Sequence, residues 1–113
     1  MELTRERALE LHRRMWTDMQ QELGDNPNTL ERECYKRLWC QEHFLDESIR
    51  DYCFLCEYAY NKYKSDGGFS CRYCPIKWDC AYCFKGDSIK KSYRNMPISK
   101  LLALPERKFD EVN

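Results

Sequence analysis

The sequence predicts a small α-rich α+β domain with two N-terminal helices, a CxxC...CxxC zinc-knuckle middle (zinc-ribbon or treble-clef-like) and a short C-terminal helix. Three observations carry this prediction. Apolar residues recur at helical spacing in the first 45 residues, six cysteines form CxxC pairs between residues 53 and 83, and a proline-bounded apolar segment lies near the end.

The chain of 113 residues suffices for one domain with a modest core, which a bound metal would help to stabilise. We therefore expect a single domain over residues 1–113. Its expected parts are a helical half (1–52), a zinc-binding half (53–84), a connector with a short docking helix (85–105) and a frayed tail (106–113).

Residues 4–23 are predicted to form the first helix, because apolar side chains recur every three or four positions and Gly24 supplies a stop. His12 lies within this apolar row, where a core or interface histidine is favoured over a metal ligand or a base. The apolar row comprises Ala8, Leu9, Leu11, Met15, Trp16, Met19 and Leu23.

A second helix is predicted from the turn at "DNPN" to about Leu45, with Asn28 and Glu31 forming a capping box at its start. The main apolar face of this helix comprises Leu30, Cys34, Leu38, Gln41 and Leu45. Trp39 and His43 lie on the opposite side, so we expect a partner or the rest of the fold to cover them.

The eight cysteines are interpreted as metal ligands and buried thiols rather than disulfides. The first residues are highly charged, and no apolar run has the length of a signal peptide or a membrane span. These features predict a cytoplasmic protein, and cytosolic thiols are kept reduced.

Cys53/Cys56 and Cys71/Cys74 are separated by fourteen residues, which is the spacing of a closed four-thiolate zinc site. We therefore predict zinc as a cofactor. Alternatives remain for the third pair: Cys80 and Cys83 could join Cys71 and Cys74 in a tighter site. They could also join Cys40 and His43 in a second metal site, or they could be buried thiols.

A short helix is predicted near the end of the chain, because Pro97 suits a helix start and Pro105 a helix end. Ile98, Leu101 and Leu102 would give this helix a small apolar face. We expect it to dock on the rest of the domain.

No catalytic constellation is recognised in the sequence, and a zinc ion held by four thiolates has no open position for water. We therefore predict that the protein is not an enzyme, has no small-molecule substrate and does not enter a membrane.

Charge is divided unevenly along the chain. Residues 1–57 hold 8 Lys/Arg and 13 Asp/Glu, a balance of −5, whereas residues 58–94 hold 8 Lys/Arg and 3 Asp/Glu, a balance of +5. Basic residues interleaved with aromatic ones could bind nucleic acid. The candidate residues for this alternative are Lys62, Lys64, Arg72, Lys77, Lys90, Lys91 and Arg94.

Four segments, "ALELHRRMW", "CFLCEYA", "CRYCPIKW" and "LLALPERK", make most of the chain resemble small cysteine-rich zinc-binding proteins of bacteriophages and prophages of Gram-positive bacteria. The group is largely without assigned biochemistry. The resemblance implies the cytoplasm of a bacterial host as the setting and metal-ligand roles for the first four CxxC cysteines.

The leading functional hypothesis is a zinc-stabilised protein-interaction module, a phage-encoded inhibitor or adaptor that acts on a host or defence protein. Its expected partner-binding residues are Trp39, His43 and Trp16, because aromatic side chains tend to anchor interfaces. Nucleic-acid binding through the basic segment is the alternative, and the zero net charge of the whole chain disfavours it.

Overall fold

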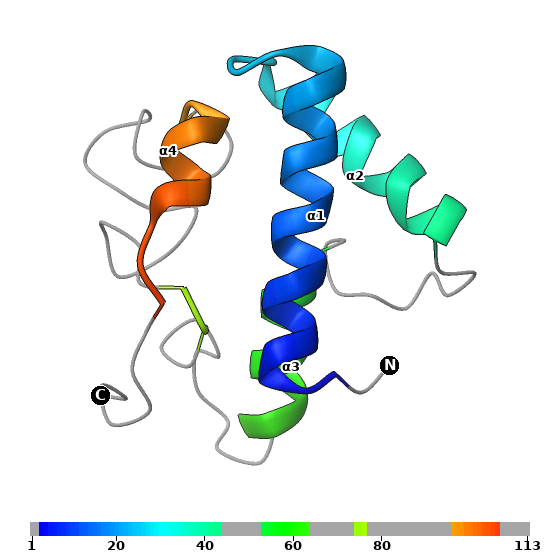
Figure 1. Ribbon diagram of the computed structural model, residues 1–113. Coiled ribbons are helices and arrows are strands. Elements are labelled where there is room, and N and C mark those ends of the chain that lie inside the picture. Colours follow the sequence, from blue (N-terminus) through cyan, green and yellow to red (C-terminus); the bar gives the residue numbers. More distant parts are fainter. Residues whose placement is uncertain (1–2, 44–52, 64–73, 77–95, 107–113) are drawn as a thin grey trace.

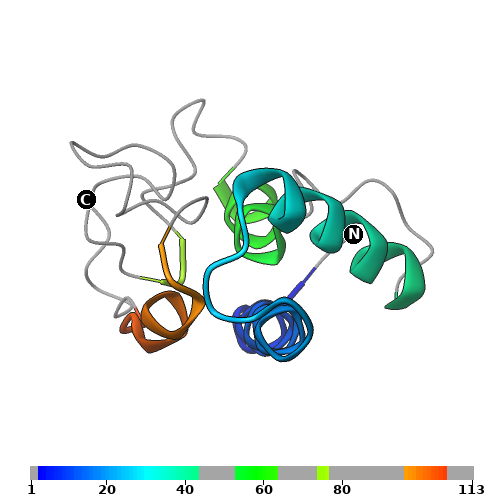
Figure 2. The same cartoon turned by 90° about the horizontal axis from the view of Figure 1, so that it is seen from above.

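The computed structural model describes residues 3–43, 53–63, 74–76 and 96–106. In these ranges the chain forms four helices: α1 (Arg5–Leu23), α2 (Thr29–His43), α3 (Phe54–Tyr63) and α4 (Ile98–Ala103). The long helix α1 contacts each of the other three, which lie around it (Figure 1, Figure 2).

The β part of the predicted α+β class is wrong for the described part of the chain, which is mostly helical and contains no strand. Its β-type pairing is an isolated antiparallel bridge between Ile76 and Glu106. The composition gives one physical reason, because Ile and Val, the aliphatic residues that favour strands, are scarce.

The predicted zinc-knuckle architecture is also wrong, because residues 54–63 form α3. Phe54, Leu55, Tyr58 and Ala59 recur at the one- and four-residue spacing of one helix face, and all four are buried. The sequence prediction missed this helical period because it interpreted the segment from its cysteines. Among the described residues, no group of three or more His, Cys, Asp or Glu is placed to hold a metal.

The first predicted helix is confirmed as α1. Thr4 caps its start, where the backbone N–H of Arg7 donates to Thr4 Oγ1 at 3.1 Å. Gly24 ends it with φ of +85°, a left-handed conformation that glycine adopts without strain. The buried face of α1 comprises Ala8, Leu9, Leu11, His12, Met15, Trp16 and Met19.

The predicted capping box at the start of α2 is confirmed. The backbone N–H of Glu31 donates to Asn28 Oδ1 at 2.8 Å, and the N–H of Asn28 donates to Glu31 Oε1 at 2.9 Å. The helix ends at His43, and Leu45, its predicted end, lies outside the described residues.

The predicted short C-terminal helix is confirmed as α4, whose Ile98 and Leu101 are buried. Pro97, at its N-cap, makes no side-chain capping bond. The α1–α2 turn supplies one instead: the Asp25 carboxylate accepts from the Ser99 backbone N–H at 2.7 Å and from Ser99 Oγ at 2.8 Å. These two bonds are the main cause of the lowered pKa of Asp25. A residue distant in sequence thus fixes where α4 begins.

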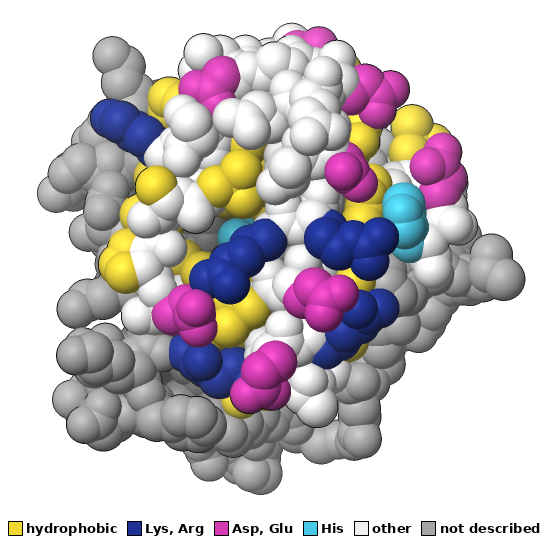
Figure 3. Space-filling model, in the orientation of Figure 1, with side chains coloured by type: hydrophobic (Ala, Val, Ile, Leu, Met, Phe, Trp, Pro, Cys, Tyr) yellow, Lys and Arg dark blue, Asp and Glu magenta, His cyan; other side chains and the backbone are white. Residues whose placement is uncertain are grey.

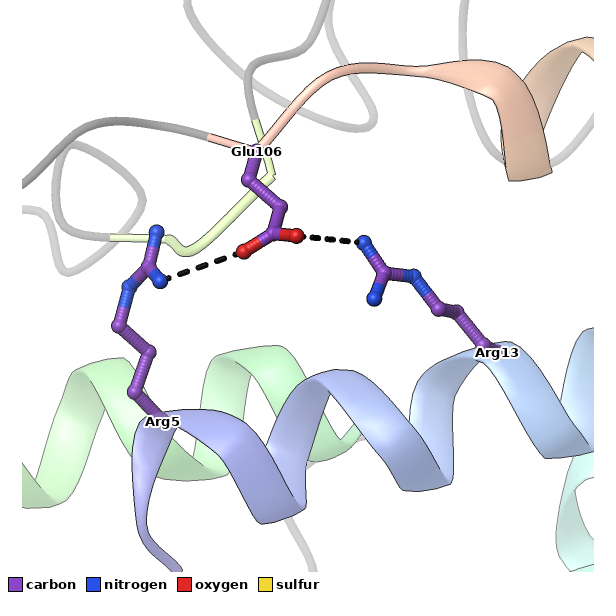
Figure 4. A network of polar contacts seen from close by, with 3 residues as sticks. All are labelled: Arg5, Arg13 and Glu106. Atoms are coloured by element: carbon purple, nitrogen blue, oxygen red, sulfur yellow. Dashed lines mark hydrogen bonds and ion pairs between the residues drawn. The ribbon is translucent and has the colours of Figure 1, made fainter.

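Glu106 attaches the chain after α4 to the outer face of α1 (Figure 4). Arg5 Nη1 lies 3.3 Å from Glu106 Oε1, and Arg13 Nη2 lies 3.0 Å from Oε2. The hydrogen bond from Arg13 is the main reason that the pKa of Glu106 is lowered. Exposed pairs of this kind contribute at most about 1 kcal/mol each, so they orient the segment more than they stabilise the fold.

Candidate interaction surface

Helix α2 buries the side that carries Trp39, which is only 3% exposed. Its indole Nε1–H donates to Asp18 Oδ2 of α1 at 2.8 Å, and its ring meets Phe54 of α3 edge-on at 5.6 Å between ring centres. Contacts with two neighbouring helices through one large side chain fix the rotation of α2 about its own axis.

Two cationic residues lie on the same buried side of α2. Arg32 donates from Nε to the Pro27 carbonyl at 2.9 Å and from Nη1 to the Met96 carbonyl at 2.6 Å. Lys36 Nζ lies 3.7 Å from Glu33 Oε1. A buried charge is tolerated only with such partners. Arg32 therefore links α2 to two other segments, the α1–α2 turn and the residues that directly precede α4.

The opposite face of α2 exposes three apolar side chains spaced one turn apart. Leu30 is 72% exposed and Leu38 is 56% exposed, with Cys34 exposed between them. We call Leu30, Cys34 and Leu38 the α2 stripe. This main apolar face of the helix does not pack against the core, because the opposite side buries a tryptophan and the long aliphatic stems of a lysine and an arginine.

A group of carboxylates lies around Tyr35, which directly follows Cys34 of the α2 stripe in sequence. Burial is the first cause of the raised pKa of Tyr35, which is about 12, and nearby negative charges raise it further. The carboxylates responsible are those of Asp18, Glu22 and Glu42. We call these three the acidic edge. Figure 3 shows acidic and hydrophobic side chains next to one another over this side of the molecule.

The aromatic residues expected to anchor a partner are placed differently from the sequence prediction. Trp16 and Trp39 both lie in the core and are 3% exposed, so neither offers a surface anchor. His43 is exposed, with its ring stacked on that of Trp39 at 3.9 Å. Its Nδ1 lies 2.9 Å from the Trp39 carbonyl, and because a carbonyl only accepts, Nδ1 carries the proton in this contact.

The predicted zinc ligands are described only in part. Cys53 is half-buried directly before α3, and Cys74 is buried, both against the same hydrophobic core. Cys56 lies within the first turn of α3, and Cys71 lies outside the described residues. The described part of the chain therefore does not show whether the four predicted ligands lie together.

The alternative second site is described only through Cys40 and His43, because Cys80 and Cys83 lie outside the described residues. Cys40 is buried, and burial is the first cause of the raised pKa of its thiol, which is about 11. The positive charge of Lys36 opposes this rise, and Cys53 adds to it.

The predicted nucleic-acid-binding residues fall almost entirely outside the described residues. Lys62 lies within α3. The others, Lys64, Arg72, Lys77, Lys90, Lys91 and Arg94, are in undescribed segments. The described residues therefore give no distances or contacts that bear on nucleic-acid binding by this segment.

The sequence pattern detected the α2 stripe as part of the main apolar face of the second predicted helix, but it did not show whether that face is exposed. It gave no signal for the acidic edge, because Asp18 and Glu22 belong to α1 whereas Glu42 belongs to α2. None of the helices in the described part of the chain is both long enough and apolar enough to cross a membrane. Comparison of the chain with protein-family models, curated proteins and solved structures found no match.

Proposed function

We propose that this chain is a non-catalytic protein-interaction module that binds a partner protein through the α2 stripe. The supporting observation is the exposure of Leu30 and Leu38 on one helix face, at 72% and 56%. Single exposed leucines are ordinary on soluble proteins, but an exposed apolar row along one helix face is typical of interaction surfaces. The absence of a catalytic role is inferred from the sequence, which contains no recognised catalytic constellation.

The biological setting of the proposal comes from the resemblance to small cysteine-rich phage proteins. In that setting the chain acts in the cytoplasm of a bacterial host, and its partner is a host or defence protein that it inhibits or redirects. The class of partner is inferred by analogy with that group of proteins, and identification of the captured protein tests it.

Zinc bound by Cys53, Cys56, Cys71 and Cys74 is part of the same proposal. Cys53 and Cys74 lie against one hydrophobic core, so a metal held by both would link the start of α3 to the segment around Ile76. A closed thiolate site supplies folding free energy rather than chemistry. Elemental analysis of protein purified without added metal should find at least about one zinc per chain. Less than about half an equivalent in folded protein would contradict this part of the proposal.

Affinity capture from a bacterial lysate, with and without nuclease, tests the interaction function. A protein captured by the wild-type chain should persist after nuclease treatment and should be lost with Leu30→Ser combined with Leu38→Ser. The matched control is Arg7→Ser with Arg14→Ser, which alters exposed positions on α1. The control variant should retain the captured protein.

The rival function predicts the opposite pattern. Lys90→Glu with Lys91→Glu should leave capture intact if the α2 stripe binds a protein. Capture that is lost with nuclease or with these lysine substitutions, and kept in the leucine variant, would replace the proposal by nucleic-acid binding.

A further inference from the structure

The exposed charges beside the α2 stripe are mainly negative. Of the Lys and Arg residues of α2, which the structure describes over its whole length, Arg32 and Lys36 are buried on the opposite side and Arg37 is exposed. The acidic edge contributes the exposed carboxylates of Glu22 and Glu42 and the part-buried carboxylate of Asp18, and Glu31 is a further exposed acid on α2. An apolar row bordered by negative charge is complementary to an apolar surface bordered by positive charge.

The spacing of the α2 stripe also restricts the shape of its partner. Leu30, Cys34 and Leu38 are each four residues apart and so form a ridge inclined to the helix axis. A helix that packs its own four-residue ridges against such a row crosses at roughly 50°. The row spans about 12 Å of α2, which suits a short, oblique contact with one helix.

Resting on the proposed function, we propose that the α2 stripe binds an amphipathic helix whose apolar row is flanked by Lys or Arg residues that face the acidic edge. The leucines of the stripe supply apolar contact, and the carboxylates select the sign of charge on the partner helix. Electrostatic complementarity of this kind determines which of several apolar helices is accepted.

A second copy of the chain fits this surface poorly. A two-fold interface presents the same patch on both subunits, so one centred on the α2 stripe would bring two acidic edges toward each other. Repulsion between like charges opposes that arrangement. The same carboxylates also oppose the approach of nucleic acid to this face.

Two synthetic peptides test the inference on the full-length protein. Both are helical, about 18 residues (~27 Å) long, and carry the same row of leucines. One has lysine flanks and the other glutamate flanks. Fluorescence anisotropy should show the lysine peptide binding at least about tenfold more tightly, with a preference that shrinks as salt is raised.

Matched variants of the protein separate specific recognition from net charge. Glu22→Gln with Glu42→Gln should weaken binding of the lysine peptide about fivefold. The same charge change at the start of α1, Glu6→Gln with Glu10→Gln, should change binding less than about twofold. Leu30→Ser with Leu38→Ser should weaken it by at least about tenfold. Equal effects of the two glutamate pairs would overturn the inference.

The remaining outcomes distinguish this inference from the proposed function. If neither peptide binds, or both bind equally, a basic amphipathic helix is excluded as the occupant of the α2 stripe. Capture of a lysate protein that depends on Leu30 and Leu38 would still support the interaction function. Sedimentation should show a monomer. A wild-type dimer that Leu30→Ser with Leu38→Ser dissociates would identify a second copy as the occupant and overturn the inference.

Discussion

Helices α1 and α2 follow each other in sequence and both have an apolar row, yet they use their rows in opposite ways. Helix α1 buries the row that its sequence displays, from Ala8 to Met19. Helix α2 exposes Leu30, Cys34 and Leu38 and buries Arg32, Lys36 and Trp39 instead. Periodicity therefore predicts that a helix forms but does not decide which face meets the core.

The difference follows from what each face can contact. The apolar row of α1 is wide enough to meet both α3 and α4 (Figure 2). Helix α2 contacts α1, and its Trp39 also reaches Phe54 of α3. One tryptophan with a hydrogen-bonded indole and two long aliphatic stems bury more surface than two leucines and a cysteine.

The strongest test of the comparison is to remove the buried anchor of α2. Trp39→Ala should lower the free energy of unfolding by about 3–5 kcal/mol, because it leaves a cavity between three helices. Leu38→Ala on the opposite face should change it by at most about 0.5 kcal/mol. Urea denaturation of both variants measures the difference.

If Trp39→Ala does not fold, a milder substitution keeps the test available. Trp39→Phe retains an aromatic ring but loses the hydrogen bond to Asp18, at an expected cost of about 1 kcal/mol. A larger loss from Leu38→Ala than from either Trp39 variant would reverse the assignment of the two faces.

The second test uses two arginines on opposite sides of α2. Arg32→Met should cost about 3 kcal/mol, because the carbonyls of Pro27 and Met96 lose a buried donor. Arg37→Met, on the exposed side, should change stability by less than about 0.5 kcal/mol. Equal thermal stability of the two variants would show that Arg32 contributes nothing beyond an exposed residue.

The third test concerns the histidine that α1 buries. Burial, followed by the charges of Arg13 and Lys36, lowers the pKa of His12 to about 3, and in the unfolded chain it is about 6.5. Between these values only the unfolded chain takes up the proton, so stability falls as pH decreases below 6.5. At pH 5 this loss is about 2 kcal/mol.

Comparison with His12→Leu isolates this contribution. From pH 7 to pH 5 the wild-type protein should lose about 2 kcal/mol more than the variant in urea denaturation, because the other titrating groups are common to both. Identical pH dependence of the two proteins would mean that His12 is hydrated or protonated in the folded state.

The smallest expected effect comes from the α2 stripe itself. Leu30→Ser combined with Leu38→Ser should leave the melting temperature nearly unchanged, corresponding to less than about 0.5 kcal/mol, since neither side chain is buried. A loss of about 2 kcal/mol or more would indicate that the stripe is covered within the folded chain. It would then be unavailable to a partner.

Local signals were sufficient for much of the helical framework. Thr4, the capping box of Asn28 and Glu31, and Gly24 mark helix boundaries through bonds and dihedral angles within a few residues. The segment from Phe54 to Tyr63 carried an equally local helical period, which the cysteine pair Cys53/Cys56 at its start obscured. Nothing local revealed that Asp25 would cap α4, because those residues are more than seventy positions apart.

The candidate interaction surface was likewise predictable from local sequence only in part. The sequence by itself determined that Leu30, Cys34 and Leu38 share one face of a helix, because a regular backbone fixes which side chains align. Only the tertiary structure decided that this face is exposed and that Asp18 and Glu22 of α1 join Glu42 around Tyr35. Burial is a competition between the two faces of a helix for contacts with other elements, and its outcome depends on the size and hydrogen bonds of residues such as Trp39 and Arg32.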